Sequence, residues 1–149
     1  MAVKERAVRK TGPQAPADAA DARALVAALL DAGPGASVPA VSGATLADAL
    51  LVTSELVTNA FRHGGGLAGF EAEIDPDADA LELTVTDRSS ELPHTVPGRA
   101  LLGGGPPAGP VEGGFGWPLI RLLADRVSVA PLPAGGKRIR VWLRLHGRA

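Results

Sequence analysis

Residues 45–87 read TLADALLVTSELVTNAFRHGGGLAGFEAEIDPDADALELTVTD, and the spacing of their apolar residues changes partway along. Over residues 45–63 the apolar residues recur every three or four positions, which predicts a helix. After three glycines they alternate with charged residues or threonine, which predicts half-buried strands over 70–75 and 81–86. The Pro- and Asp-rich residues between the two strands indicate a hairpin turn. A helix followed by an antiparallel strand pair is typical of an α+β fold.

The predicted helix carries a start signal and one apolar face. Thr45 with Asp48 three residues later resembles a capping box, which places the start of the helix at Thr45. The residues expected to be buried step by four and three along the chain: Leu46, Leu50, Thr53, Val57 and Ala60.

Shorter elements flank this region on both sides. The apolar spacing predicts a helix over 18–32, with Gly33 as its stop, and a short helix over 117–124. Alternation predicts paired strands over 126–130 and 137–145. The predicted fold is therefore a two-layer α/β sandwich, in which a mostly antiparallel sheet carries helices on one face.

The composition excludes several classes of protein. The chain has 149 residues, a net charge of -1 and no cysteine, which argues against a polyanion binder, a disulfide scaffold and a cysteine nucleophile. No apolar run is long enough to span a membrane, and the N-terminus lacks the apolar core of a signal peptide, so we expect a cytoplasmic protein. Residues 1–16 are expected to form a tail or a short strand at 7–10, and residues 17–149 a single domain.

One face of the predicted helix carries polar side chains that suit a metal and a base. Glu55, Asn59 and His63 are spaced four residues apart and share one side of the helix. An amide oxygen at Asn59 suits Mg²⁺, which leaves the Glu55 carboxylate free to accept a proton. The alternative interpretation is a solvated polar face, with His63 close to the helix C-terminus.

Asp87 ends the second predicted strand on its apolar side. It continues the row of Leu81, Leu83 and Val85, so its carboxylate must find hydrogen-bond donors in the interior. The 6-amino group of an adenine is one such donor. The alternative is a local cap, in which Asp87 accepts a bond from the backbone of its own turn.

A glycine-rich stretch leads into the short helix. Residues 97–116 contain eight Gly and four Pro, which excludes a helix or a central strand there. Gly114 and Gly116 precede Trp117 and Pro118, where free backbone N–H groups can bind an anion. An ordinary flexible loop is the alternative.

Together the three motifs resemble the GHKL ATPase superfamily, and within it the small single-domain relatives of bacterial anti-sigma factor serine/threonine kinases. The pattern Glu-x-x-x-Asn-x-x-x-His-Gly is the most specific of them, and the final hairpin from Gly135 onward is also similar. The resemblance implies a Bergerat, or histidine kinase-like, ATPase fold that binds ATP and Mg²⁺.

The resemblance also implies roles for individual residues. Asn59 would hold the magnesium ion, Glu55 would be the general base, and Asp87 would bind adenine. Residues 94–115 would form the ATP lid. The remaining nucleotide-binding residues expected are His63, Ser89, Arg99, Gly114, Gly116 and Trp117. Arg99 is chosen as a basic residue of the lid and not from a motif, and Ser89 stands where the family often carries Gly.

The implied function is phosphorylation of a Ser or Thr of an anti-sigma factor antagonist, together with binding of a sigma factor, in a possible homodimer. The alternative is a non-catalytic module that sequesters its partner with weak or no nucleotide binding. Neither interpretation involves direct nucleic-acid or membrane binding. A sensor kinase is disfavoured because the chain has no room for a phosphoacceptor domain.

The last predicted strand carries a second polar face. Arg138, Arg140, Trp142 and Arg144 alternate with its apolar residues. This outward row is interpreted either as a docking surface for an acidic partner or as a solvated sheet face.

Overall fold

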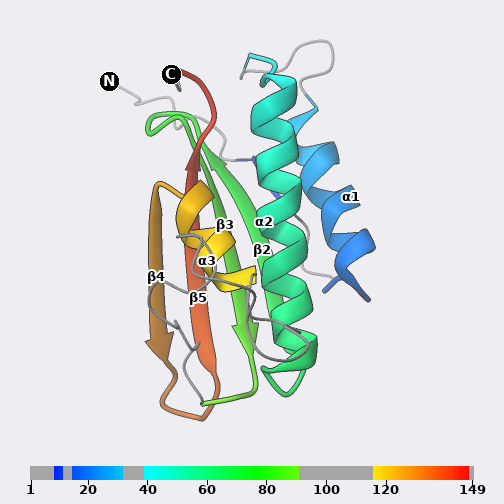
Figure 1. Ribbon diagram of the computed structural model, residues 1–149, viewed down its shortest axis with the longest axis vertical. Coiled ribbons are helices and arrows are strands. Elements are labelled where there is room, and N and C mark those ends of the chain that lie inside the picture. Colours follow the sequence, from blue (N-terminus) through cyan, green and yellow to red (C-terminus); the bar gives the residue numbers. More distant parts are fainter. Residues whose placement is uncertain (1–8, 12–14, 32–38, 91–115, 148–149) are drawn as a thin grey trace, which may run out of the picture.

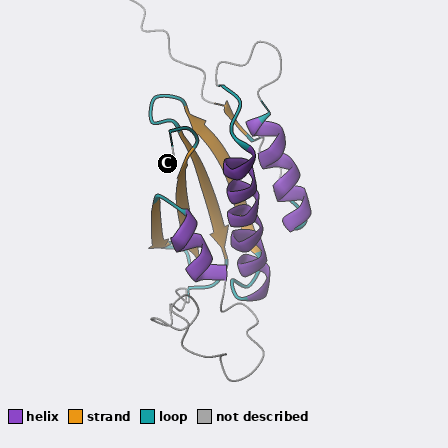
Figure 2. Ribbon diagram, turned by 45° about the horizontal axis from the view of Figure 1, so that its top comes forward, coloured by secondary structure: helices purple, strands orange, loops and turns teal. Residues whose placement is uncertain are grey.

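A computed structural model describes residues 9–11, 15–31, 39–90 and 116–147 of the chain. Within these residues a five-stranded sheet forms one layer and three helices form the other (Figure 1). All neighbouring strands pair antiparallel, and the helices lie on the same side of the sheet (Figure 2). The predicted two-layer α+β architecture is confirmed.

The strands follow the predicted hairpins. They are β1 (Arg9–Lys10), β2 (Leu67–Asp75), β3 (Ala80–Asp87), β4 (Arg126–Pro131) and β5 (Lys137–Arg144). The sheet order is β1-β2-β3-β5-β4, so the second hairpin adds to the first through its last strand. β1 falls within the strand expected at 7–10, of which residues 7 and 8 lie outside the described residues.

The helices are α1 (Ala19–Leu30), α2 (Gly43–Arg62) and α3 (Gly116–Leu123). The Asp18 carboxylate caps α1 by accepting a hydrogen bond from the Asp21 N–H at 2.8 Å. The predicted stop at Gly33 lies outside the described residues. None of the helices in the described part of the chain is long and apolar enough to cross a membrane.

The start of α2 differs from the prediction. Ser42, not Thr45, is the N-cap, because its hydroxyl oxygen accepts a bond from the Thr45 N–H at 3.1 Å. Gly43 and Ala44 do not interrupt a helix at its first turn, so it begins two residues earlier than the Thr45–Asp48 pair indicated.

The buried face of α2 is also rotated from the predicted one. Leu46 and Leu50 are only partly buried and pack at the edge of the core. Thr53, Val57 and Ala60 of the predicted row are buried as expected. The buried residues of α2 are Thr45, Ala49, Val52, Thr53, Leu56, Val57 and Ala60. The face turns because α1 and α3 pack on either side of α2, which buries positions that a helix against a sheet alone would expose.

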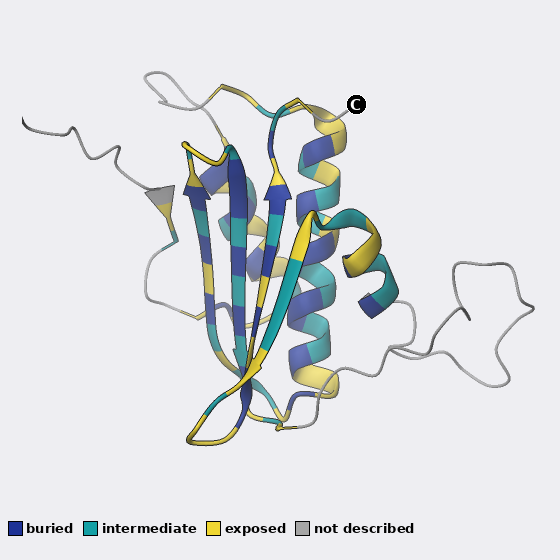
Figure 3. Cartoon of the chain, turned by 90° about the vertical axis from the view of Figure 1, so that its left-hand side faces the viewer, coloured by how far each residue is buried: buried dark blue, intermediate teal, exposed yellow. Residues whose placement is uncertain are grey.

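Buried residues alternate with intermediate ones along β3 and mostly with exposed ones along β5 (Figure 3). The predicted inward rows of β3 and β5 are confirmed, and they face α2 and the buried side of α3. On the opposite face, Arg138, Arg140 and Arg144 are exposed, and Trp142 is half-buried. The Arg126 and Arg140 guanidinium groups lie 4.6 and 5.2 Å from the Trp142 ring centroid, so they cover this aromatic ring on an otherwise open face.

Candidate functional site

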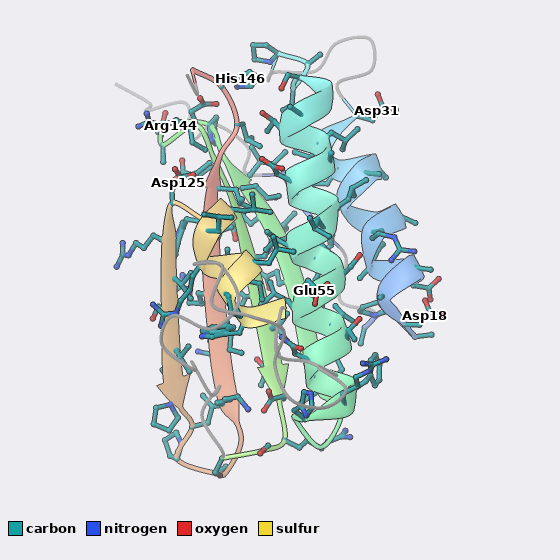
Figure 4. The ribbon with its side chains drawn as sticks, in the orientation of Figure 1. Asp18, Asp31, Glu55, Asp125, Arg144 and His146 are labelled. Carbon is teal, nitrogen blue, oxygen red and sulfur yellow. The ribbon has the colours of Figure 1, made fainter. Side chains whose placement is uncertain are left out.

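The polar face of α2 runs along the side of the helix that borders α3. Glu55 lies level with the first turn of α3 (Figure 4). Glu55 and Asn59 are half-buried, and neither side chain has a hydrogen-bond partner among the described residues. His63 is exposed and forms the C-cap of the helix, where its backbone N–H donates to the Asn59 carbonyl at 2.8 Å. Glu55 and Asn59 therefore remain available for a ligand.

Asp87 is buried at the end of β3 and meets a cation there. Its exposed fraction is 4%, and its register partner is Lys137, the first residue of β5, which is 5% exposed. The Lys137 ammonium lies 2.9 Å from Oδ2 and 3.1 Å from Oδ1 of Asp87. The Ser89 N–H donates to Oδ1 at 3.0 Å, so the expected local cap is present as well.

Two glycines allow other segments to approach Asp87. A Cβ atom at Gly64 would lie 2.6 Å from the Asp87 Oδ2 atom, and one at Gly136 would overlap the Asp87 carbonyl oxygen. The Arg88 N–H donates to the Gly64 carbonyl at 2.8 Å. These contacts join the end of α2 to the end of β3, so the first and second motifs lie side by side.

The third motif begins α3. Gly116 is its first residue, and Trp117 is 4% exposed within the core. The Trp117 indole N–H has no hydrogen-bond partner in the described residues, and the Arg121 guanidinium lies 5.4 Å from the ring centroid. Arg99, Gly114 and the rest of the expected lid at 94–115 lie outside the described residues.

Lys137 is the residue of this cluster that the sequence interpretation missed. The sequence did contain a signal. Lys137 lies two and four positions before Ile139 and Val141, so its side chain points to the same core-facing side of the strand. A charged residue in such a row needs a partner of opposite charge. Asp87 ends the neighbouring core-facing row, opposite Lys137, and is that partner.

The groups with displaced pKa values lie away from this cluster. The pKa of His146 is raised, chiefly by its hydrogen bond with Asp79, whose Oδ1 lies 2.6 Å from Nδ1. The other ring nitrogen lies 3.0 Å from the Pro39 carbonyl. His146 is at the opposite end of the sheet from the start of β5 (Figure 4). It therefore joins the segment before α2 to the turn between β2 and β3.

Mg-ATP fits the residues at the Asp87 end of the sheet. A buried carboxylate can accept a bond from an adenine amino group, and the Asn59 amide oxygen is a suitable ligand for Mg²⁺. Among the described residues, no three His, Cys, Asp or Glu side chains gather to form a metal cage. Mg²⁺ bound to a nucleotide does not need such a cage, because phosphates and water supply most of its ligands.

Comparison with known protein families assigns this fold to a family. Residues 13–143 match the family described as the histidine kinase-like ATPase domain. No curated protein matches the chain. The family match covers most of the sequence, all three motifs and the described elements from α1 to β5, except the last residue of β5. The chain therefore belongs to the histidine kinase-like ATPase domain family.

Proposed function

We propose that this protein is an Mg-ATP-dependent regulator that phosphorylates a Ser or Thr of an anti-sigma factor antagonist and binds a sigma factor in the cytoplasm. The observation that carries the proposal is the meeting of three segments at one end of the sheet. Buried Asp87 lies against the end of α2, and the half-buried Glu55 and Asn59 line α2 beside the start of α3.

Each segment has one task in this proposal. Asp87 accepts a hydrogen bond from the adenine amino group, with the Ser89 backbone holding its carboxylate in place. Asn59 holds Mg²⁺ through its amide oxygen. The proposal assigns phosphate binding to the backbone N–H groups of Gly114 and Gly116, and further nucleotide contacts to His63, Arg99 and Trp117.

Glu55 is the general base. Bound Mg-ATP supplies the phosphoryl group and the metal that neutralises its charge. The Glu55 carboxylate, one turn before Asn59, accepts the proton of the incoming Ser or Thr hydroxyl. The side chain has no partner in the described residues that would compete for this proton.

A non-catalytic partner-binding module is the second candidate. It is favoured by the stretch Gly103–Gly114, which has no Lys or Arg to neutralise phosphate charge. It is also favoured by Ser89, which adds a half-buried side chain beside Asp87. A module of this kind would bind the sigma factor without transferring phosphate, as one protomer or as a homodimer.

A thermal-shift titration tests nucleotide binding. Mg-ATP or Mg-ADP binds only the folded state, so millimolar nucleotide raises the unfolding temperature. A folded protein that shows no shift at that concentration would exclude the nucleotide proposal.

Glu55→Gln separates the two candidates. We expect this variant to bind Mg-ATP within a few-fold of the parent and to lose ~10²–10⁴-fold in antagonist phosphorylation. Glu71→Gln is the matched control, because Glu71 is exposed on the sheet face away from α2. Sigma-factor binding by a parent that transfers no phosphate to its cognate antagonist would establish the non-catalytic module.

A further inference from the structure

His146 faces hydrogen-bond acceptors on both sides of its ring. Nδ1 lies 2.6 Å from Oδ1 of Asp79, and Nε2 lies 3.0 Å from the Pro39 carbonyl oxygen and 3.2 Å from that of Ala40. An ionised carboxylate and a carbonyl oxygen only accept hydrogen bonds, so both ring nitrogens must donate. Only the imidazolium form of histidine carries a proton on each nitrogen. The contacts therefore require the charged form of His146.

Asp79 holds the backbone beside the ring independently of the charge of that ring. Its φ angle is +52°, a conformation that Asp adopts more readily than most residues. The Asp79 carbonyl oxygen accepts a bond from the Leu145 N–H at 2.8 Å, and Oδ2 accepts one from the His146 backbone N–H at 3.0 Å. The chain at 145–146 therefore stays attached to the turn between β2 and β3 when the ring loses a proton.

The Pro39 and Ala40 carbonyls depend on the ring alone. Both residues are exposed and lie just before the α2 N-cap, Ser42, and among the described residues their carbonyl oxygens accept only from His146. Loss of the Nε2 proton sets a ring lone pair against these two carbonyl oxygens. Loss of the Nδ1 proton sets it against a full negative charge, which is less favourable. The neutral ring therefore keeps its proton on Nδ1 and loses the bonds from Nε2.

Asp79 is the charged side chain that faces the ring. In the same turn, Asp75 accepts a bond from the Asp77 N–H at 2.9 Å, and Asp77 is exposed. The segment before α2 presents backbone carbonyls to the ring, and the preceding charged residue of β5, Arg144, is exposed on the outer sheet face. The protonation of the ring is therefore coupled chiefly to the Asp79 carboxylate.

The geometry points to His146 as a proton-dependent clasp: the charged ring ties the backbone at Pro39 and Ala40 to the β2–β3 turn, and the neutral ring releases it while staying on Asp79. The raised pKa of His146 places this release above the ordinary value of about 6.5. The clasp thus makes the attachment of the segment before α2 depend on pH. It lies at the opposite end of the sheet from the start of β5 and does not depend on the proposed nucleotide site (Figure 4).

NMR spectroscopy of the isotope-labelled protein, from about pH 5 to about pH 9, tests the clasp without any ligand. Ring nitrogen shifts should show two protonated nitrogens at low pH and the Nδ1–H tautomer above the transition. The carbonyl carbon shifts of Pro39 and Ala40 should change with the same midpoint as the His146 ring. Losing a hydrogen bond to a charged group should raise the open population of this segment about tenfold or more, seen as faster motion of the Val41 amide. The Leu145 amide should keep its protection factor.

Three variants isolate the contact. Asp79→Asn removes the charge and keeps a residue type that tolerates positive φ, so the midpoints of the ring and of the Pro39 and Ala40 carbonyls should move together to lower pH. Asp77→Asn, the matched control, removes an exposed carboxylate from the same turn and should leave both midpoints nearly unchanged. His146→Gln should leave the two carbonyl shifts independent of pH in this range.

The outcomes decide the role of His146. An Nε2–H tautomer above the transition, or Pro39 and Ala40 shifts that do not follow the ring, would overturn the clasp. An unchanged midpoint in Asp79→Asn would overturn it as well. If Asp79→Asn does not fold, the tautomer and the carbonyl shifts of the parent still support or overturn the clasp. Nucleotide enters none of these measurements, so the proposed function and the clasp can fail independently.

Discussion

Two neighbouring glycines in the β4–β5 turn provide a test of how closely β5 approaches the site. Gly135 and Gly136 have φ angles of +97° and +83°, a region that other residues adopt only with strain. They differ in their surroundings. A Cβ at Gly135 would meet nothing within 4 Å, whereas one at Gly136 would overlap the Asp87 carbonyl oxygen and lie 3.3 Å from the Asp87 carbonyl carbon.

Alanine at each position should separate conformational strain from steric overlap. Gly135→Ala carries only the φ penalty, of order 1–3 kcal/mol. Gly136→Ala carries the same penalty and an overlap with backbone, which no side-chain rotation relieves, for which overpacking data indicate about 2 kcal/mol more. For a chain of 149 residues, that difference lowers the unfolding temperature of Gly136→Ala by about 4–8 °C relative to Gly135→Ala.

Thermal and urea unfolding followed by circular dichroism measure this difference. Gly136→Ala should also weaken Mg-ATP binding more than Gly135→Ala does, because the displaced backbone belongs to Asp87. Equal unfolding temperatures for the two variants would refute the close packing of the turn against Asp87. A loss of ATP affinity in Gly135→Ala alone would refute the link between that packing and the site.

Asn59→Ala should abolish Mg²⁺-dependent ATP binding. It should leave the unfolding temperature nearly unchanged, because the Asn59 side chain is half-buried and has no hydrogen-bond partner in the described residues. Titration calorimetry with and without Mg²⁺ measures the affinity, and an affinity equal to that of the parent would reject Asn59 as the metal ligand. The pKa of His146 is raised in the folded protein, so its charged form stabilises the fold. This stabilisation is fully present below the pKa of the unfolded chain, about 6.5, and is lost as the pH rises through the pKa of the folded protein. The difference in unfolding temperature between the parent and His146→Ala should therefore be largest near pH 6 and should shrink toward pH 8–9, and a difference that grows with pH would contradict this sign.

The fold was predictable because its patterns are local. The change in apolar spacing at the glycines after His63 separates α2 from β2, and alternation assigns the inward and outward rows of β5. The predicted capping residue of α2 was wrong because Ser42 and Thr45 are both residue types that favour the N-cap position. Only the backbone conformation distinguishes them. The buried face of α2 depends on neighbouring helices, which local spacing does not contain.

The candidate site was predictable only in part. The motif residues Glu55, Asn59 and Asp87 follow from helical spacing and strand parity. Lys137 was not predicted as the partner of Asp87, because their contact depends on the register between two strands that are distant in the chain. The approaches of Gly64 and Gly136 to Asp87 are tertiary contacts of the same kind.

The strand order also fixes when the site is completed during folding. A turn of a few residues joins β2 to β3, whereas Asp87 and Lys137 are 50 residues apart. Closing the longer loop costs about 2 kcal/mol more in chain entropy. On the ribosome, Glu55, Asn59 and Asp87 are synthesised before Lys137, so the growing chain carries the α2 motif and Asp87 without the counter-ion of that carboxylate. The proposed nucleotide site would therefore become whole only when the C-terminal hairpin docks against β3.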